Sequence, residues 1–247
     1  MKSDIPRLRM FAGPNGSGKS TIKSVVRPEM LGVYINPDDI EKQIKETDFI
    51  QFSDFGIQTS SQEVFDFFTR SSLLQQADLL GDAANLHYND EKLIFRDVSI
   101  NSYFASVVSD FIRQKLIAVK KSFTFETVMS SPDKEELLRK ARENGYRTYL
   151  YYVATEDPEI NISRIDYRIS LGGHSVPKDK VISRYKRSLD LLMEATRNTD
   201  RAFIFDNSTH EQIWLAEITN GSKLEMKGNF VPNWFRNALL DKFGETS

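Results

Sequence analysis

A glycine-rich segment between residues 13 and 20 carries the clearest chemistry in this sequence. It reads Gly-Pro-Asn-Gly-Ser-Gly-Lys-Ser and matches the pattern G-x-x-x-x-G-K-[ST]. Glycines let the backbone turn its N–H groups toward a phosphate, and a following helix aims its positive end at the same place. We therefore predict a nucleoside triphosphate site made by Gly13, Pro14, Asn15, Gly16, Ser17, Gly18, Lys19, Ser20 and Thr21.

Two side chains at the end of this segment predict the cofactors. The Lys19 ammonium would reach the β- and γ-phosphates, and the Ser20 hydroxyl would coordinate Mg²⁺. We expect ATP and Mg²⁺, and the motif leaves GTP open as the nucleotide.

Carboxylates follow two of the predicted strands. Asp38 comes just after residues 32–35, where a carboxylate could orient an acceptor hydroxyl and take its proton. The alternative is that Asp38 and its neighbour Asp39 only favour a helix N-terminus. Glu126 and Thr127 follow the run at 122–125 and could hold substrate hydroxyls or hydrated Mg²⁺; the alternative is a capping or surface glutamate.

A segment rich in arginine and glycine predicts a lid over the phosphates. The break at Gly172-Gly173 separates two helical arginine pairs, and His174 follows it. Such a lid could bring guanidinium groups onto the transferring phosphoryl group and exclude water. The alternatives are surface ion pairs for each arginine and an exposed loop position for the histidine. The candidate substrate ligands here are Arg164, Arg168, His174, Arg184 and Arg187.

Asn207 ends the last predicted core strand. Ligands of parallel α/β sheets bind at the carboxyl ends of the strands, so this side chain could lie beside the nucleotide base or the glycine-rich segment. The alternative is an ordinary turn, in which asparagine is common.

The elements that position these residues alternate between strands and helices. Apolar runs predict strands at 8–12, 32–35, 122–125, 147–154 and 201–206, a hairpin at 214–227, and helices at 19–26, 37–45, 100–118, 132–144, 158–170, 178–199 and 232–243. This order is typical of an α/β fold with a parallel sheet and helices on both faces.

The domain organisation follows from the same pattern. We predict a single domain over 1–247, with a lid-like segment at about 160–190 and a mostly helical insertion at about 47–99. In that insertion, residues 62–80 have helical spacing, and 85–97 fit a loop or a short hairpin.

Composition excludes several kinds of site. The chain has no cysteine, so disulfides, thiolate catalysis and cysteine-bound zinc are ruled out. The net charge of −2 disfavours nucleic acid and anionic membranes as partners. No apolar run reaches membrane-spanning length and no long apolar leader opens the chain, so we expect a cytoplasmic protein.

Four segments in order resemble the zeta-toxin-like P-loop kinases. They are AGPNGSGKST, INPDD, FTFETVMSS and RISLGGHSVPKDKVISRYKRSL. The resemblance implies a nucleoside-kinase-like P-loop fold with Asp38 as base, Glu126 as the acid after the third strand and Arg168 as a lid arginine. It also implies the phosphorylation of a nucleotide sugar such as UDP-N-acetylglucosamine and an antitoxin protein as partner. The toxins have an arginine where Gly-Gly-His stands here, and 47–99 is unlike the toxins.

We therefore expect an ATP-dependent kinase that phosphorylates a hydroxyl of a small metabolite. The catalytic residues would be Lys19, Asp38, Glu126 and Arg168. The alternatives are a nucleotide-binding regulatory ATPase, or a toxin-module component without sugar kinase activity.

Overall fold

The computed structural model describes residues 5–172 and 175–244, which fall into two compact units. The first unit combines Met1–Gly32 with Thr124–Ser247, and the second is Val33–Phe123. The predicted P-loop and lid belong to the first unit, whereas Asp38 and the predicted insertion belong to the second.

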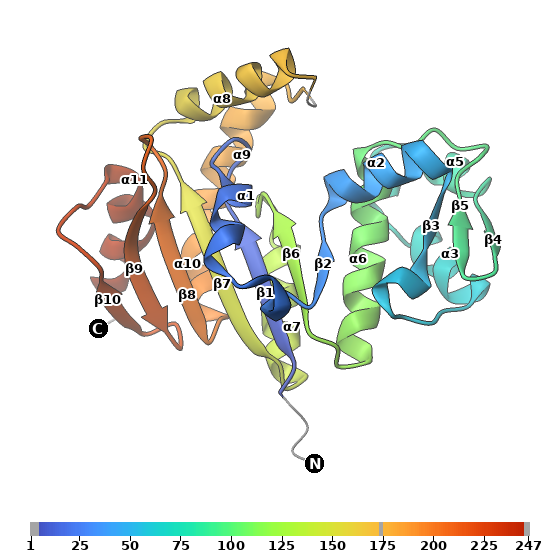
Figure 1. Ribbon diagram of the computed structural model, residues 1–247, viewed down its shortest axis with the longest axis horizontal. Helices are drawn as coiled ribbons and strands as arrows, with labels where there is room; N and C mark the ends of the chain where they lie inside the picture. The colour runs from blue at the N-terminus through green and yellow to red at the C-terminus, as the bar shows by residue number, and fades with distance from the viewer. Residues whose placement is uncertain (1–4, 173–174, 245–247) are drawn as a thin grey trace. The chain divides into compact units, whose positions relative to one another are not determined.

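The first unit contains a mostly parallel sheet whose strand order is β10-β9-β8-β7-β1-β6 (Figure 1). β1, β7 and β8 are parallel, and β9 and β10 form an antiparallel hairpin at one edge. Phe11 pairs with Tyr151, which pairs with Phe203. The strands are β1 Arg7–Ala12, β6 Phe123–Thr127, β7 Arg147–Ala154, β8 Arg201–Asp206, β9 Ile213–Thr219 and β10 Lys223–Met226. The strands predicted at 8–12, 122–125, 147–154 and 201–206 and the hairpin at 214–227 are thereby confirmed.

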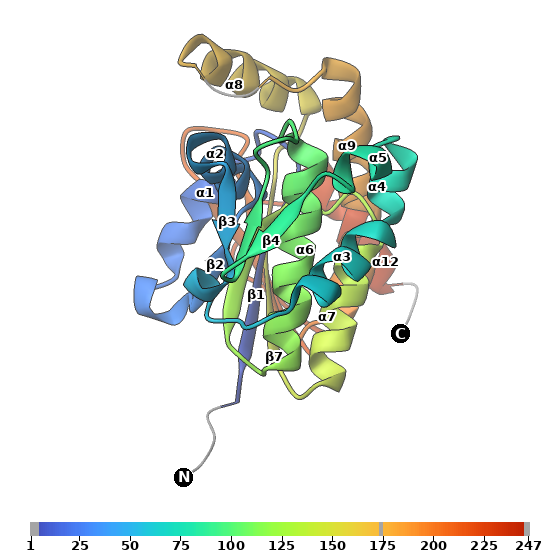
Figure 2. The same cartoon turned by 90° about the vertical axis from the view of Figure 1, so that its right-hand side faces the viewer.

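Helices cover both faces of this sheet, as the α/β prediction requires. Figure 2 shows α1 and α7 on opposite sides of β1. The helical segments of this unit are α1 Lys19–Ile22, η1 Lys23–Val25, η2 Pro28–Met30, α7 Asp133–Glu143, α8 Pro158–Ser170, α9 Lys178–Asp190, α10 Leu192–Arg197, α11 Asn233–Phe235, η4 Arg236–Leu240 and α12 Asp241–Gly244.

The two faces of β1 show how the core forms. Leu8 and Met10 are fully buried on one face. Phe11 points to the other face and packs with Ile22 and Val26 of the segment after the P-loop. Because side chains alternate along a strand, one short apolar run fills the core on both faces.

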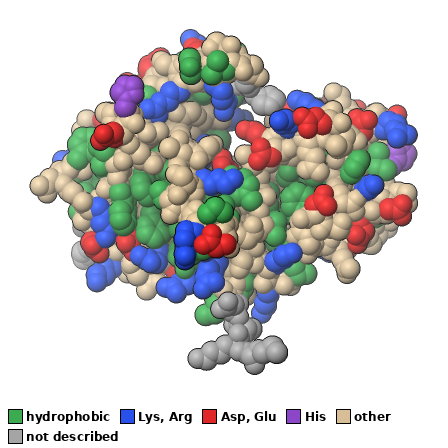
Figure 3. Space-filling model, viewed as in Figure 1, with side chains coloured by type: hydrophobic (Ala, Val, Ile, Leu, Met, Phe, Trp, Pro, Cys, Tyr) green, Lys and Arg blue, Asp and Glu red, His purple; other side chains and the backbone are tan. Residues whose placement is uncertain are grey.

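Part of the sheet lies open beside this packed region. Tyr151 stacks on Phe203 with ring centroids 4.9 Å apart, and Phe203 contacts Trp214 at 6.1 Å. Trp214 is 41% exposed. Figure 3 shows apolar side chains gathered over this part of the first unit.

The second unit is built around the long helix α6, which contacts α2, α3 and α4 (Figure 2). Phe52 and Phe111 meet at its centre with ring centroids 5.1 Å apart. Its elements are β2 Val33–Ile35, α2 Pro37–Thr47, β3 Phe49–Gln51, η3 Phe52–Phe55, α3 Ser61–Thr69, α4 Ser72–Gln76, α5 Leu80–Ala83, β4 His87–Asn89, β5 Lys92–Ile94 and α6 Ser102–Ala118.

The predicted insertion contains a strand, β3, that the sequence pattern did not reveal. A three-stranded sheet runs in the order β3-β5-β4, and the hairpin considered for 85–97 is its β4–β5 part. The helical spacing over 62–80 is confirmed as helices, but it is divided between α3 and α4. Ser71 accepts a hydrogen bond from the Leu74 N–H and starts α4, so the chain breaks after α3.

Two other predicted helices are shorter than expected. The helix over 19–26 is a four-residue α1 followed by a 3₁₀ turn, and the helix over 178–199 divides at Leu191 into α9 and α10. A membrane-spanning helix is absent from residues 5–172 and 175–244, because no helix there is both long and apolar enough.

Candidate active site

The P-loop follows β1 at the carboxyl edge of the sheet, and its glycines adopt conformations that other residues avoid. Gly13, Gly16 and Gly18 have φ angles of 143°, 73° and 97°. An L side chain is strained in this region of positive φ. The glycine spacing of the motif is therefore matched by the backbone that it was expected to allow.

Each of these glycines is also pressed against a different neighbour. A Cβ on Gly13 would lie 2.0 Å from the carbonyl oxygen of Val153, at the end of β7. A Cβ on Gly16 would lie 2.6 Å from the Asn161 carbonyl oxygen, and one on Gly18 would lie 2.2 Å from Asn207 Nδ2. The loop is thus enclosed by β7, by α8 and by the turn after β8.

Polar groups inside the loop fit a phosphate ligand. Lys19 Nζ donates to the carbonyl oxygens of Gly13 and Pro14 at 2.9 and 3.0 Å. The hydroxyl of Ser17 is buried and, within the described part of the chain, has no hydrogen-bond partner. A buried polar atom without a partner is costly, so the loop is arranged for a polar occupant.

The end of the loop where Mg²⁺ is predicted to bind differs from the expectation in one respect. Ser20 and Thr21 are exposed in the first turn of α1. α1 has only four residues, so it has little macrodipole to offer an anion. The loop amides and Lys19 must supply most of the electrostatic attraction.

Asn207 lies against the loop, which was one of its two predicted positions. Its Nδ2 donates to the Ser17 carbonyl oxygen at 2.8 Å, and its backbone N–H donates to the Ala154 carbonyl oxygen at 2.9 Å. The neighbouring Asp206 carboxylate is fully buried and accepts hydrogen bonds from Ser208 and from Trp234 Nε1. Asn207 therefore holds the loop backbone from a rigid strand end.

A second polar contact to the loop was missed by the sequence reasoning. Asn161, fully buried in the first turn of α8, donates from Nδ2 to the Asn15 carbonyl oxygen at 2.6 Å. Its Oδ1 accepts from the Thr155 hydroxyl, and the Thr155 carbonyl accepts from Tyr185 at 2.6 Å. Burial raises the pKa of Tyr185, helped by nearby carboxylates such as that of Glu156, so its hydroxyl remains a donor at physiological pH.

The predicted lid is formed by α8 and α9, which contact each other (Figure 1). Arg164 is half-buried and donates from Nη2 to the Thr209 carbonyl oxygen at 3.3 Å. Arg168 is exposed near the end of α8. On α9, Arg184 is half-buried and Arg187 is exposed. His174 lies outside the described residues.

Glu126 and Thr127 are the last two residues of β6, whereas they were expected just after the strand. Glu126 is 8% exposed, and the Thr127 hydroxyl accepts from the Met129 N–H at 3.0 Å. Met129 is itself buried with a φ of 54°, a conformation that costs energy for a residue other than glycine. The turn after β6 is thereby held in one shape.

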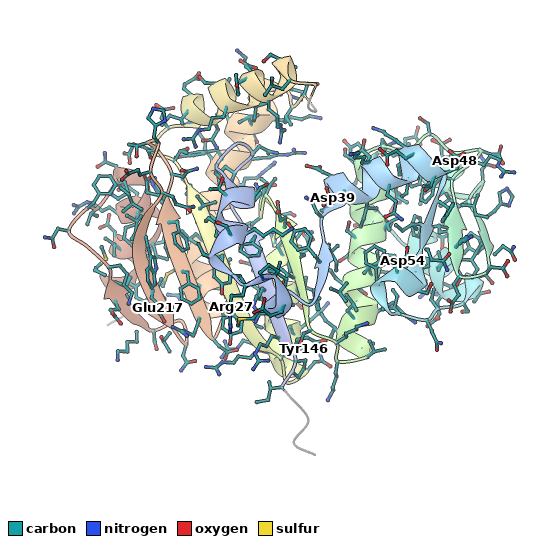
Figure 4. The ribbon with its side chains drawn as sticks, viewed as in Figure 1. Arg27, Asp39, Asp48, Asp54, Tyr146 and Glu217 are labelled. Carbon is teal, nitrogen blue, oxygen red and sulfur yellow. The ribbon has the colours of Figure 1, made fainter. Side chains whose placement is uncertain are left out.

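Asp38 belongs to the second unit, where it lies in the first turn of α2. The Asn36 side chain caps this helix by accepting from the Asp38 N–H at 3.0 Å. Asp38 and Asp39 are exposed carboxylates in that first turn, and Figure 4 marks Asp39. Both residues therefore suit the helix N-terminus, and the role of Asp38 as a base stays a prediction.

Two solved structures are similar to this chain, and the first of them shares its fold. The complex of AvrRxo1-ORF1 with AvrRxo1-ORF2, solved with sulphate ions, aligns with a TM-score of 0.53 and 14% identity, over 90% of this chain and 61% of that chain. The PezAT toxin–antitoxin system of Streptococcus pneumoniae aligns with a TM-score of 0.48 and 16% identity, over all of this chain and 82% of that chain.

A curated relative matches a shorter stretch. An uncharacterized protein of Haemophilus influenzae is 35% identical over 63 residues, which is 26% of this chain and 45% of that protein. The match thus spans less than half of this relative, and the chain spans about three fifths of the chain it matches in the AvrRxo1 complex.

A family model described as Zeta toxin matches residues 87–219, which is more than half of the 247-residue chain. The match includes α8, which carries Asn161, α9, and Asn207 at the end of β8, and it begins after the P-loop. The loop and the match are therefore separate observations, and both agree with the resemblance of the four sequence segments. The chain belongs to the zeta toxin family.

Proposed function

We propose that this protein is a kinase that transfers the γ-phosphoryl group of ATP to a hydroxyl of a small molecule. The observation that carries the proposal is the closed P-loop, in which three glycines are packed against three other segments around Lys19. Membership of the zeta toxin family supports phosphoryl transfer as the reaction.

The loop residues have defined tasks in this proposal. The amides of Gly16 to Lys19 would bind phosphate oxygens, and the Lys19 ammonium would exchange its two carbonyl partners for them. The Ser20 hydroxyl would hold Mg²⁺. When bound, ATP and Mg²⁺ would supply the transferable group and a divalent charge at the phosphates.

The residues proposed to bind and activate the acceptor are those predicted from the sequence. Asp38 would accept the proton of the acceptor hydroxyl on a carboxylate oxygen, and Glu126 and Thr127 would hold substrate hydroxyls or hydrated Mg²⁺. The lid residues Arg164, Arg168, His174, Arg184 and Arg187 would compensate the charge that develops on the phosphoryl oxygens or contact the substrate.

The resemblance to zeta toxins names a first substrate and a class of partner. We propose to test UDP-N-acetylglucosamine before other nucleotide sugars and metabolites. We also propose an antitoxin protein as partner, because the PezAT structure is that of a toxin–antitoxin system.

The test is incubation with labelled ATP, Mg²⁺ and either UDP-N-acetylglucosamine or a metabolite extract, followed by mass spectrometry of the products. The kinase proposal expects a product heavier by one phosphoryl group. Asp38→Asn should abolish that product and leave the binding of an ATP analogue intact. Release of inorganic phosphate with no phosphorylated metabolite would instead identify a regulatory ATPase, and unchanged turnover in Asp38→Asn would remove Asp38 from the role of base.

A further inference from the structure

Asn161 makes a contact that ties the lid to the phosphate loop. Its Nδ2 donates to the Asn15 carbonyl oxygen at 2.6 Å, across 146 positions of the chain. The carbonyl group of the same residue lies so near Gly16 that a Cβ there would be 2.6 Å away. The first turn of α8 is therefore packed directly on the loop.

The orientation of the Asn161 amide is determined by its neighbours. A backbone carbonyl can only accept a hydrogen bond, so the NH₂ group must face Asn15. The oxygen then faces Thr155, whose hydroxyl donates to it. The reverse orientation would place two oxygen acceptors against each other at the loop.

The Asn15 carbonyl is part of the turn that presents the loop amides. Ser17 donates its N–H to the Pro14 carbonyl oxygen at 3.2 Å inside this turn. Because a peptide group is planar, fixing the Asn15 carbonyl also fixes the direction of the Gly16 N–H. Asn207 fixes the Ser17 carbonyl in the same way from the other side, so two asparagines hold successive parts of the loop.

Asn161 also shares a helix face with the predicted lid arginines. Arg164 and Arg168 follow it by three and seven positions on α8, a spacing that places all three on one side of the helix. The contact between Asn161 and the loop therefore also fixes the positions of the two arginines relative to the loop. Tyr185 extends the contact to α9, since it donates to the Thr155 carbonyl oxygen.

We propose that Asn161 is a positioning residue for phosphoryl transfer, which sets the direction of the loop amides and the register of the α8 arginines through Asn15 and Thr155. This inference rests on the proposed function. It deepens that function by assigning a role to a residue that touches the loop and not the substrate. Its loss should weaken the binding of the triphosphate, whatever the acceptor is.

The sharpest variant is Asn161→Asp, which keeps the shape of the side chain and replaces the NH₂ donor by an oxygen. The introduced carboxylate would face the Asn15 carbonyl oxygen, an acceptor to which it cannot donate. Calorimetry should show the Kd of a non-hydrolysable ATP analogue rising about tenfold to a hundredfold. The Kd of inorganic tripolyphosphate should rise in parallel, because the effect acts on the phosphates and not on the base.

Thr155→Val is the second variant and keeps the amide itself. It removes the donor that orients Oδ1, so the Kd should rise by about threefold and the Gly16 amide should exchange its hydrogen faster than in the wild type. If Asn161→Asp does not fold, Thr155→Val decides the question by these two measurements.

Thr196→Val is the matched control, because it also removes a buried hydroxyl in the first unit. Thr196 is fully buried, and its hydroxyl donates to the Leu192 carbonyl oxygen of its own helix at 2.8 Å. It should lower the melting temperature and leave the Kd within about twofold. This variant measures what a purely structural loss does to nucleotide binding.

The outcomes separate the two proposals. Wild-type affinity for both ligands in Asn161→Asp, measured below its melting temperature, overturns the positioning role and leaves the kinase proposal standing. A wild-type protein that binds neither ATP analogue nor tripolyphosphate overturns the kinase proposal and this inference with it. Equal losses in Asn161→Asp and Thr196→Val would show that Asn161 acts through stability alone.

Discussion

The two units of this protein differ in what they bury. The first buries polar side chains along its ligand edge, and Ser17, Thr155, Asn161 and Asp206 are all fully inaccessible. In the described residues of the second unit the buried polar side chains are Glu41, Ser109 and Arg113. Buried hydrogen-bond networks specify one geometry, whereas an apolar core mainly has to be filled. The buried polar groups of the first unit therefore fix the shape of the loop, whereas the second unit is stabilised mainly by apolar packing.

The units also differ in charge. Residues 33–123 contain nine Lys and Arg against fourteen Asp and Glu, which leaves 24 basic and 21 acidic residues in the rest of the chain. An acidic surface repels phosphates. The charge that attracts a triphosphate therefore belongs to the unit that carries the P-loop.

Glycine substitutions should give the largest difference between the two units. Gly13→Ala would place a Cβ 2.0 Å from a backbone oxygen at a φ of 143°, so we expect a loss of about 4 kcal/mol and no nucleotide binding. Gly81→Ala is the control in the second unit, where no atom lies within 4 Å of the added Cβ; it should stabilise α5 by about 0.5 kcal/mol. Urea denaturation and calorimetry measure both effects, and similar losses in the two variants would contradict the account of the loop.

Aromatic truncation should reveal the apolar character of the second unit. Phe52 is fully buried and contacts Phe111, so Phe52→Ala should cost about 3 kcal/mol. Hydrogen exchange should accelerate in α6 and remain slow in β1 and β7. Uniform acceleration in both units would show that they unfold together.

The tryptophans test the buried carboxylate of the first unit. Trp234→Phe removes the N–H that donates to Asp206 at 2.7 Å and should cost about 2 kcal/mol, because a buried acceptor loses a partner. Trp214→Phe, at a residue that is 41% exposed, should cost less than about 1 kcal/mol. Chemical denaturation measures both, and an equal cost would argue against a special role of the Asp206 contact.

The smallest expected effect is a pH dependence in the second unit. Hydrogen bonds from Lys115, the Ser60 backbone and Thr59 lower the pKa of Glu63 from 4.5 to about 2. A depressed folded pKa contributes stability above pH 4.5, and this contribution disappears as the pH falls toward 2. Because Glu63 is half-exposed, we expect less than about 1 kcal/mol. Melting curves of the wild type and Glu63→Gln should converge at low pH, and a constant difference would contradict this assignment.

Sequence patterns predicted the first unit well because its strands and helices are long or bounded by clear signals. The local sequence is enough to predict the strand at 147–154 and the turn made by the P-loop glycines. The strands β3, β4 and β5 have only three residues each, which is too short for a period of two to stand out. The break before α4 likewise depends on one serine cap that a continuous apolar pattern concealed.

The candidate site was predicted in part, for a related reason. The loop residues can be identified from the spacing of the motif, and Asn207 can be identified from its place at the end of a predicted strand. No sequence pattern identifies Asn161, because its partner Asn15 is distant in sequence. The two residues meet only when the P-loop and α8 come together in the fold. An asparagine three residues before Arg164 could have been tested as a helix-face neighbour of the lid, and this is the one signal that the sequence offers.

The hydrogen bond between Trp234 and Asp206 has a practical consequence for optical spectroscopy. The chain contains two tryptophans. Trp234 donates to Asp206, and the next residue, Asn207, donates to the Ser17 carbonyl oxygen of the phosphate loop. Its indole should emit at shorter wavelength than the more exposed Trp214. A Trp214→Phe protein would keep a single intrinsic fluorophore, whose emission would follow the arrival of a nucleotide in real time and without a label.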